Sequence, residues 1–381
     1  MTRPTVLLSG VEFGWGSAGK LSAICSELLD ADPTIRLVGL GSLLGRPVLR
    51  HMPVERWYDA AGPAAATVDR VFDEESVDAA LIVLDPELAA SLAARSCPTV
   101  YVDSLPFLWG VEDAVPGDVA VYCAQRYVGL GAEPPASLRS VRNLRWVGGI
   151  VESTGTPVPR TGPVVVNVGG LHSPFVGSAD AGYLTLVLPT ALAALSAVAA
   201  TEVVVCGNLP PDAEGLLSGL PSSPVQMRPG LPHREFLDLL QKAPVCLTSP
   251  GLTTLLELSA AGTPTVVLPP QNISQVLNAE QFASLVDPAL RVRWPAGLVD
   301  LEAVFDAAAR TEETGLKLFY GAVAAAATIA DRWRATIEED VVEALRCAAC
   351  ASDWSRLARA VGTEGARDVA VAVTEQLETR P

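Results

Sequence analysis

The sequence is poor in basic residues and has very few histidines. Its 381 residues include 27 lysines and arginines against 43 aspartates and glutamates, which gives a formal charge of −16. Non-specific nucleic-acid binding requires basic patches, and anionic membrane surfaces attract basic segments, so we expect neither kind of partner. The three histidines are too few for a histidine-rich metal site.

Long apolar runs are missing too, although 49% of the residues are hydrophobic. No uninterrupted run reaches the roughly 20 residues of a transmembrane helix. The first apolar run, Thr5–Leu8, is too short for a signal peptide, and no cleavage pattern follows it. The seven cysteines are scattered and odd in number, so we expect reduced thiols and a cytoplasmic protein. Cys347 and Cys350 have metal or redox spacing, but no second pair accompanies them.

Short apolar runs alternate with helical stretches in the first half of the chain. Such alternation predicts a parallel sheet covered by helices on both faces. A second series of the same kind begins at residue 163, and strands are no longer expected beyond residue 301. The expected strands are Thr5–Leu8, Ile35–Leu40, Ala80–Leu84, Thr99–Val102, Val119–Tyr122, Val164–Val168, Glu202–Cys206, Val225–Met227 and Val245–Leu247.

The length allows two domains, because it exceeds the usual size of a single core. We expect an N-terminal α/β domain over residues 1–150 and a second one over 163–300. The segment 151–162 is rich in Gly, Thr and Pro and is typical of a linker. Residues 301–381 are expected to form a helical segment, either packed back on the first domain or independent of it.

The most informative motif lies in the second series, where an apolar strand ends at Ser249-Pro250-Gly251. A helix with early hydroxyls follows, and Glu257 lies two turns into it. Free backbone N–H groups at such a helix start can hold the phosphates of a nucleotide, and the Glu257 carboxylate can accept both hydroxyls of a ribose. The alternative interpretation is an ordinary βαβ unit with a surface glutamate.

This pattern resembles the nucleotide-sugar site of GT-B glycosyltransferases over residues 163–285. The resemblance implies an α/β protein of GT-B type, with two Rossmann-like domains facing across a cleft and C-terminal helices. It also implies a UDP-sugar donor and no cofactor or metal, because helix dipoles and backbone donors hold the diphosphate. The implied donor-binding residues are Gly169, Gly170, His172, Ser173, His233, Ser249, Gly251, Thr253, Thr254, Glu257, Gln271 and Asn272. Relatives often carry Asp-Gln where Gln271-Asn272 and Gln275 stand here, so the sugar is left open.

A glycine-rich loop, Gly14–Lys20, follows the first strand and opens a helix. It contains most of a P-loop, but Leu21 stands where a Ser or Thr should hold Mg²⁺. It also contains the dinucleotide fingerprint, but the second strand ends without the acid that would bind the ribose. The third interpretation is the loop of a GT-B acceptor domain, in which Lys20 is a first-turn surface lysine.

Glu12 is the one ionisable residue between the first strand and these glycines. Ligands of open α/β sheets bind at the carboxyl ends of the strands, and we expect Glu12 to be the general base there. Asp103 ends another strand and is its rival or orienting partner. The alternative interpretations are that Glu12 is a solvated loop glutamate and that Asp103 is a capping aspartate. The expected acceptor-binding residues are Gly14, Trp15, Gly16, Ser17, Phe107, Trp109, Gln125 and Arg126.

The stretch Glu12–Lys20, together with Asp103-Ser104-Leu105 and Trp109, is similar to cytosylglucuronate synthase and its relatives. Those enzymes of nucleoside-antibiotic pathways transfer glucuronate from UDP-glucuronate to N1 of cytosine. The resemblance implies a small acceptor such as a pyrimidine base. A GT-B-like nucleotide-sugar epimerase and a non-catalytic homologue acting as a partner protein are the alternatives. The oligomeric state, a homodimer included, does not follow from the sequence.

Overall fold

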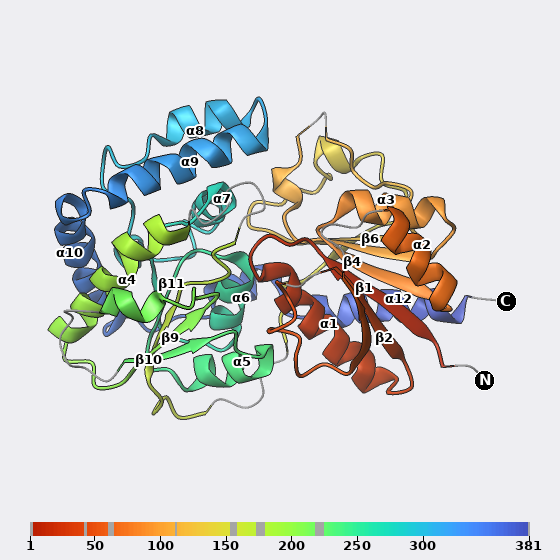
Figure 1. Cartoon of the computed structure of the whole chain (residues 1–381), viewed down its shortest axis with the longest axis horizontal. Coiled ribbons are helices and arrows are strands. Elements are labelled where there is room, and N and C mark those ends of the chain that lie inside the picture. Colours follow the sequence, from red (N-terminus) through yellow and green to blue (C-terminus); the bar gives the residue numbers. More distant parts are fainter. Residues whose placement is uncertain are drawn as a thin grey trace. The chain divides into compact units, whose positions relative to one another are not determined.

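The computed structural model describes residues 3–41, 44–59, 65–110, 113–152, 158–172, 180–217 and 225–379. The chain forms two compact α/β units, each built on its own parallel sheet (Figure 1). The first unit comprises Met1–Thr154 and Ala358–Pro381, and the second comprises Gly155–Leu357.

The first unit contains a seven-stranded parallel sheet. Its strands lie in the order β3 (Val54–Tyr58), β2 (Arg36–Leu40), β1 (Thr5–Gly10), β4 (Ala79–Val83), β5 (Thr99–Asp103), β6 (Val121–Gln125) and β7 (Leu144–Val147). The inner strands β1, β4, β5 and β6 are buried along their whole length. This burial explains their continuous apolar sequences, since a parallel sheet is covered on both faces.

Helices cover both faces of this sheet, as the alternation predicts. On one face α1 (Gly16–Ala31) and α12 (Gly365–Glu378) pack on side chains such as Val6 and Leu8. On the other face α2 (Ala65–Glu74) and α3 (Pro86–Ala94) pack on Leu7 and Ile82. Adjacent residues of one strand thus pack into different cores, because successive side chains of a β-strand point to opposite faces of the sheet.

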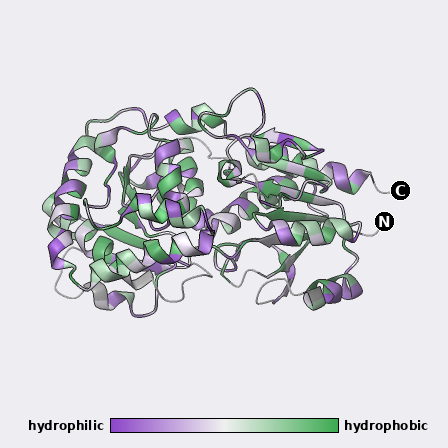
Figure 2. Ribbon diagram, turned by 90° about the horizontal axis from the view of Figure 1, so that it is seen from above, coloured by the Kyte–Doolittle hydropathy of each residue, from purple (hydrophilic) through white to green (hydrophobic). Residues whose placement is uncertain are grey.

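The second unit contains a five-stranded parallel sheet. Its order is β10 (Val225–Pro229), β9 (Val203–Gly207), β8 (Val164–Asn167), β11 (Cys246–Thr248) and β12 (Thr265–Val267). The helices of this unit are α4 (Asp180–Ala197), α5 (His233–Lys242), α6 (Leu252–Ala260), α7 (Ile273–Gln281), α8 (Leu301–Ala308), α9 (Glu312–Ala327) and α10 (Asp331–Ala348). In Figure 2 the strands of both sheets are coloured as hydrophobic, and hydrophilic residues gather on the helices.

Residues 301–381, which the sequence groups as one helical segment, are divided between the two units. Helices α9 and α10 pack against α4 of the second unit. The boundary falls within α11 (Arg356–Val361), and α12 then packs against α1 and the first sheet. The buried residues Ala366, Val369, Ala370 and Val373 of α12 recur at helical spacing, and this apolar stripe explains its attachment.

Candidate functional site

The strand order of the second unit reverses between β8 and β11. At the carboxyl ends of these strands, Asn167 and Thr248 are register partners. The Asn167 side-chain amide donates to Thr248 Oγ1 at 3.1 Å, and its oxygen accepts the Gly169 N–H at 3.0 Å. Ligands of open α/β sheets bind at such a reversal, so these buried polar groups organise the edge where a ligand is expected. Asn167 was not among our candidates, although a polar residue that ends an apolar strand is a recognisable signal.

The loop after β8 depends on close backbone contacts. Gly169 has a positive φ of 66°, and so does the non-glycine residue Leu171, at 49°. A Cβ added to Gly207, at the end of β9, would lie 2.8 Å from the Gly169 carbonyl oxygen, so only glycine fits there. Strained non-glycine residues tend to gather at binding sites. His172, half-buried, ends the described part of this loop, and Ser173 lies outside the described residues.

The turn Ser249-Pro250-Gly251 leads directly into α6. Gly251 is the N-cap residue of α6, and no side chain caps the helix. Thr253 is buried and Thr254 half-buried in its first turn. A helix start without a side-chain cap presents backbone N–H groups and a partial positive charge, both suited to an anion.

Glu257 and His233 form a buried pair. Glu257 lies within α6, and His233 is the first residue of α5. The distance from His233 Nε2 to Glu257 Oε1 is 2.6 Å, and the two side chains are only 3% and 2% exposed. The structure therefore joins two of the donor-binding residues that the resemblance implies.

The segment after β12 closes the same edge with amide side chains. Gln271 donates to the Val168 carbonyl at 2.5 Å, and its own N–H donates to Gln275 Oε1 at 2.8 Å. Asn272 caps α7, because its Oδ1 accepts the Gln275 N–H at 2.9 Å. Asn278 donates to the Pro250 carbonyl at 3.1 Å, while its buried Oδ1 has no partner among the described residues. Asn278 thus ties α7 to the turn before α6, a contact that our candidate list missed.

The first unit has a similar reversal of strand order, between β1 and β4. The Val11 N–H donates to the Val83 carbonyl at 2.9 Å, which fixes the chain as it leaves β1. Glu12 follows and is half-buried, and a Cβ on Gly41, just after β2, would lie 4.0 Å from its Oε1. Leu84, just after β4, has a positive φ of 59°. Glu12 therefore lies at the carboxyl edge of this sheet, where ligands bind.

The glycine loop is tied to its surroundings by polar contacts. Gly14 has a φ of 62°, the Trp15 indole donates to the Leu44 carbonyl at 3.0 Å, and the Ser17 hydroxyl donates to the Val11 carbonyl at 2.7 Å. Gly16 begins α1, which has no side-chain cap. Our expectation of a surface lysine at Lys20 is wrong, since its side chain is only 2% exposed. The reason is that α1 buries every residue from Ser17 to Cys25.

Asp103 is buried, with 1% exposure, and its carboxylate accepts three hydrogen bonds. They come from the Leu105 N–H at 2.9 Å, the Trp109 indole at 2.6 Å and the Tyr122 hydroxyl at 2.7 Å. Burial raises the pKa of the Asp103 carboxyl, and these hydrogen bonds oppose that shift. These three hydrogen bonds fix the position of the chain that follows β5.

The remaining acceptor candidates differ in their surroundings. Gln125 is buried, and its side-chain oxygen accepts the Ile150 N–H at 3.0 Å. Arg126 is exposed. Phe107 lies in a 3-10 helix, and its ring centroid is 5.4 Å from that of Tyr127.

Neither a metal cluster nor a membrane-spanning helix is found in the described parts of the chain. Among those residues, no three His, Cys, Asp or Glu side chains come together as metal ligands. None of the helices there is both long and apolar enough to cross a membrane. The seven cysteines are free thiols, five of them buried.

No family model matches the sequence, and no curated protein matches it. Solved structures match over nearly the whole chain. UGT89C1 of Arabidopsis thaliana, in complex with UDP-L-rhamnose, has a TM-score of 0.55 at 12% identity, covering 99% of this chain and 100% of that one. The spinosyn rhamnosyltransferase SpnG has a TM-score of 0.53 at 13% identity, and the match covers 99% of this chain and 96% of that one. A Listeria monocytogenes protein described as a putative UDP-N-acetylglucosamine 2-epimerase has a TM-score of 0.53 at 11% identity. The match covers 100% of this chain and 97% of that one. At these identities the likeness concerns the fold, which is of GT-B type.

Proposed function

We propose that the protein is a glycosyltransferase that moves a sugar from a UDP-sugar to a small acceptor. The observation that carries the proposal is the uncapped start of α6 at the strand reversal of the second unit, together with the buried pair that Glu257 of this helix forms with His233 of α5. Two solved structures of the same fold support it, a rhamnosyltransferase and a protein crystallised with UDP-L-rhamnose.

The diphosphate would lie at the start of α6 and near the loop after β8. The N–H groups of the first turn of α6 can donate to phosphate oxygens, and the helix dipole stabilises negative charge there. Gly169 and Gly170 let the backbone come close to the ligand. These groups can hold the diphosphate without a divalent cation.

The ribose would bind the Glu257 carboxylate. An ionised carboxylate only accepts hydrogen bonds, so His233 Nε2 donates to Oε1 in the observed pair. Each carboxylate oxygen has further lone pairs, which leaves acceptor capacity for the two ribose hydroxyls. His233 then acts as a positioning residue, since it fixes the orientation of the carboxylate.

Glu12 would act as the general base. In the transfer, the acceptor's nucleophilic atom attacks the anomeric carbon, the bond from that carbon to the diphosphate oxygen breaks, and UDP leaves with the electron pair. Glu12 accepts the proton that the acceptor loses. We favour Glu12 over Asp103 because the Asp103 carboxylate already accepts three hydrogen bonds within its own unit.

For the donor and acceptor, we propose UDP-glucuronate and a pyrimidine base such as cytosine, in a nucleoside-antibiotic pathway. The resemblance of Glu12–Lys20 and Asp103–Leu105 to cytosylglucuronate synthase supports this narrower proposal. A thermal-shift screen of the intact chain against nucleotides and nucleotide sugars tests it. A ligand that binds the native state raises its stability by RT ln(1 + [L]/Kd), so UDP and the true donor should raise the melting temperature more than ADP or GDP. Absence of any shift with UDP-sugars would favour a non-catalytic homologue.

A nucleotide-sugar epimerase is the second candidate. The Listeria monocytogenes structure supports it, because its TM-score equals that of the rhamnosyltransferase. An epimerase would need the same donor site but no acceptor. UDP and free sugar, without a glycosylated acceptor, would favour this candidate.

A further inference from the structure

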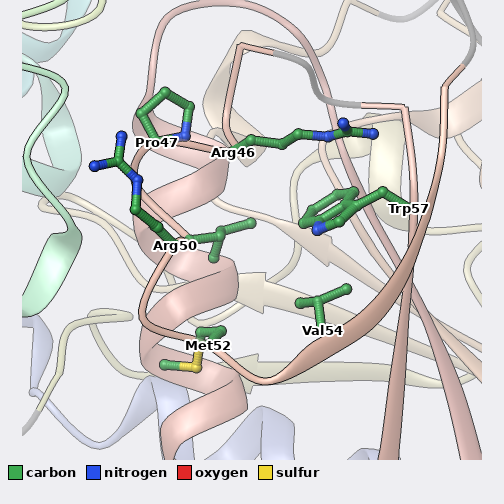
Figure 3. Close-up of a pocket in the computed structure, with 7 residues that line it drawn as sticks. Arg46, Pro47, Arg50, Met52, Val54 and Trp57 are labelled. Atoms are coloured by element: carbon green, nitrogen blue, oxygen red, sulfur yellow. The ribbon is translucent and has the colours of Figure 1, made fainter.

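A cavity of about 420 Å³ lies in the first unit, between β3 and the chain that joins it to β2. This volume falls within the range of small-molecule sites. Figure 3 shows Pro47, Met52, Val54 and Trp57 around it, with Arg46 reaching over Trp57 and the Arg50 head on the other side. The transfer proposed above uses none of these residues.

The wall formed by Trp57 is held rigidly. Trp57 pairs in register with Gly39 of β2, and a Cβ added there would lie 2.2 Å from its ring. The Arg46 guanidinium carbon lies 5.0 Å from the centroid of the same ring, in cation–π geometry. The indole therefore cannot rotate away without breaking its contacts with β2 or with Arg46, so this wall of the cavity is preformed.

The charges at the cavity do not balance. Arg46 forms an ion pair with Asp59 through Nη2, whereas its Nε is buried and has no hydrogen-bond partner among the described residues. Arg50 is exposed, and no acidic side chain in the described parts of the chain pairs with it. The cavity thus has one uncompensated positive charge, in a chain whose formal charge is −16.

We propose that this cavity binds a small monocarboxylate with an apolar body. Its carboxylate would accept hydrogen bonds from Arg50, whose exposed side chain is free to turn inward. The planar guanidinium matches the two oxygens of a carboxylate, and its hydrogen bonds are charge-assisted. The apolar body contacts Met52 and Val54. One net positive charge suits a monoanion better than a dianionic phosphate.

The test is a titration of the intact, ¹⁵N-labelled chain with phenylacetate and hexanoate, and with their amides, which keep the shape but lack the charge. The chain has seven tryptophans, and the Trp57 indole signal is assigned by its loss in Trp57→Phe. We expect both carboxylates to shift this signal with saturation and to bind about tenfold or more tightly than the amides.

Arg50→Gln should weaken carboxylate binding about tenfold, since it removes the unpaired cation. Arg142→Gln is the matched control, because Arg142 is exposed in the same unit and pairs with Asp118; it should bind like the wild type. The proposal is overturned if neither carboxylate gives saturable shifts, if the amides bind equally well, or if Arg50→Gln and Arg142→Gln behave alike. Tighter binding of inorganic phosphate than of both carboxylates would also overturn it.

Discussion

A Glu257→Ala substitution should weaken UDP binding about 10- to 150-fold. The range follows from the surroundings of the carboxylate, which is 2% exposed and lies 2.6 Å from His233 Nε2. Hydrogen bonds from ribose hydroxyls to such a carboxylate are charge-assisted and contribute about 1.5–3 kcal/mol. This energy corresponds to the stated loss of affinity, because each 1.4 kcal/mol changes a dissociation constant about tenfold.

The same substitution should also lower the free energy of unfolding. It leaves the His233 imidazole, 3% exposed, without its acceptor, and a buried donor without a partner costs about 1–3 kcal/mol. Glu257→Gln keeps an acceptor oxygen for His233 but removes the charge. This variant should regain most of the stability while UDP binding stays weak, which separates the two roles of the carboxylate.

Calorimetric titration with UDP and urea unfolding of the same preparations measure the two effects. Glu280→Ala is the control in the same unit, since the Glu280 side chain is 65% exposed and pairs with Arg291 rather than with a proposed site residue. The UDP affinity of this variant should equal that of the wild type. If both Glu257 variants fold and bind UDP as the wild type does, Glu257 does not hold the ribose and the reasoning about this site fails.

Glu12→Gln keeps size and hydrogen bonding but removes basicity, so kcat should fall about 10²- to 10⁴-fold while UDP binding persists. If Glu12→Gln keeps near wild-type turnover and Asp103→Asn is inactive, Asp103 is the general base instead of Glu12. EDTA should leave UDP binding and turnover almost unchanged, because in the proposed function backbone N–H groups hold the phosphates. Loss of activity that Mg²⁺ or Mn²⁺ restores would contradict this. Hydrogen bonds from Arg36 and Tyr58 hold the pKa of the Glu75 carboxyl below 4.5 in the folded protein. The ionised Glu75 side chain therefore stabilises the folded state fully above pH 4.5, and this stabilisation disappears as the pH falls through the folded-state pKa. Glu75→Gln should therefore cost about 1.5–3 kcal/mol of unfolding free energy at pH 7 and much less at pH 3, and an equal cost at both values would disprove the linkage.

The sheets could be predicted in large part because inner parallel strands are continuous apolar runs. Strands β1, β4 and β5 of the first unit fall where such runs were recognised. The strands β3 and β7 were not expected from the sequence. Both lie at the edges of the sheet and expose charged residues such as Glu55 and Arg145, so they lack the apolar run of a buried strand.

The contacts of the site residues could not be derived from the sequence, because they depend on tertiary packing. The motif at Ser249–Gly251 predicts a helix start, and α6 begins there without a side-chain cap. By contrast, His233 meets Glu257 only because α5 and α6 pack together. Asp103 obtains Tyr122 as a partner because β5 and β6 are neighbours in the sheet, and no local pattern contains that information.

The central claim, transfer of a sugar from a UDP-sugar, is tested most directly by mass spectrometry of the reaction products. Purified protein is incubated without added metal with UDP-glucuronate, UDP-glucose or UDP-N-acetylglucosamine and a panel of pyrimidine bases and other small acceptors. We expect UDP and a glycosylated acceptor in equal amounts, and the same product formed about 10²- to 10⁴-fold more slowly with Glu12→Gln. An isomeric UDP-sugar, or UDP with free sugar and no glycosylated acceptor under any combination, would contradict the account.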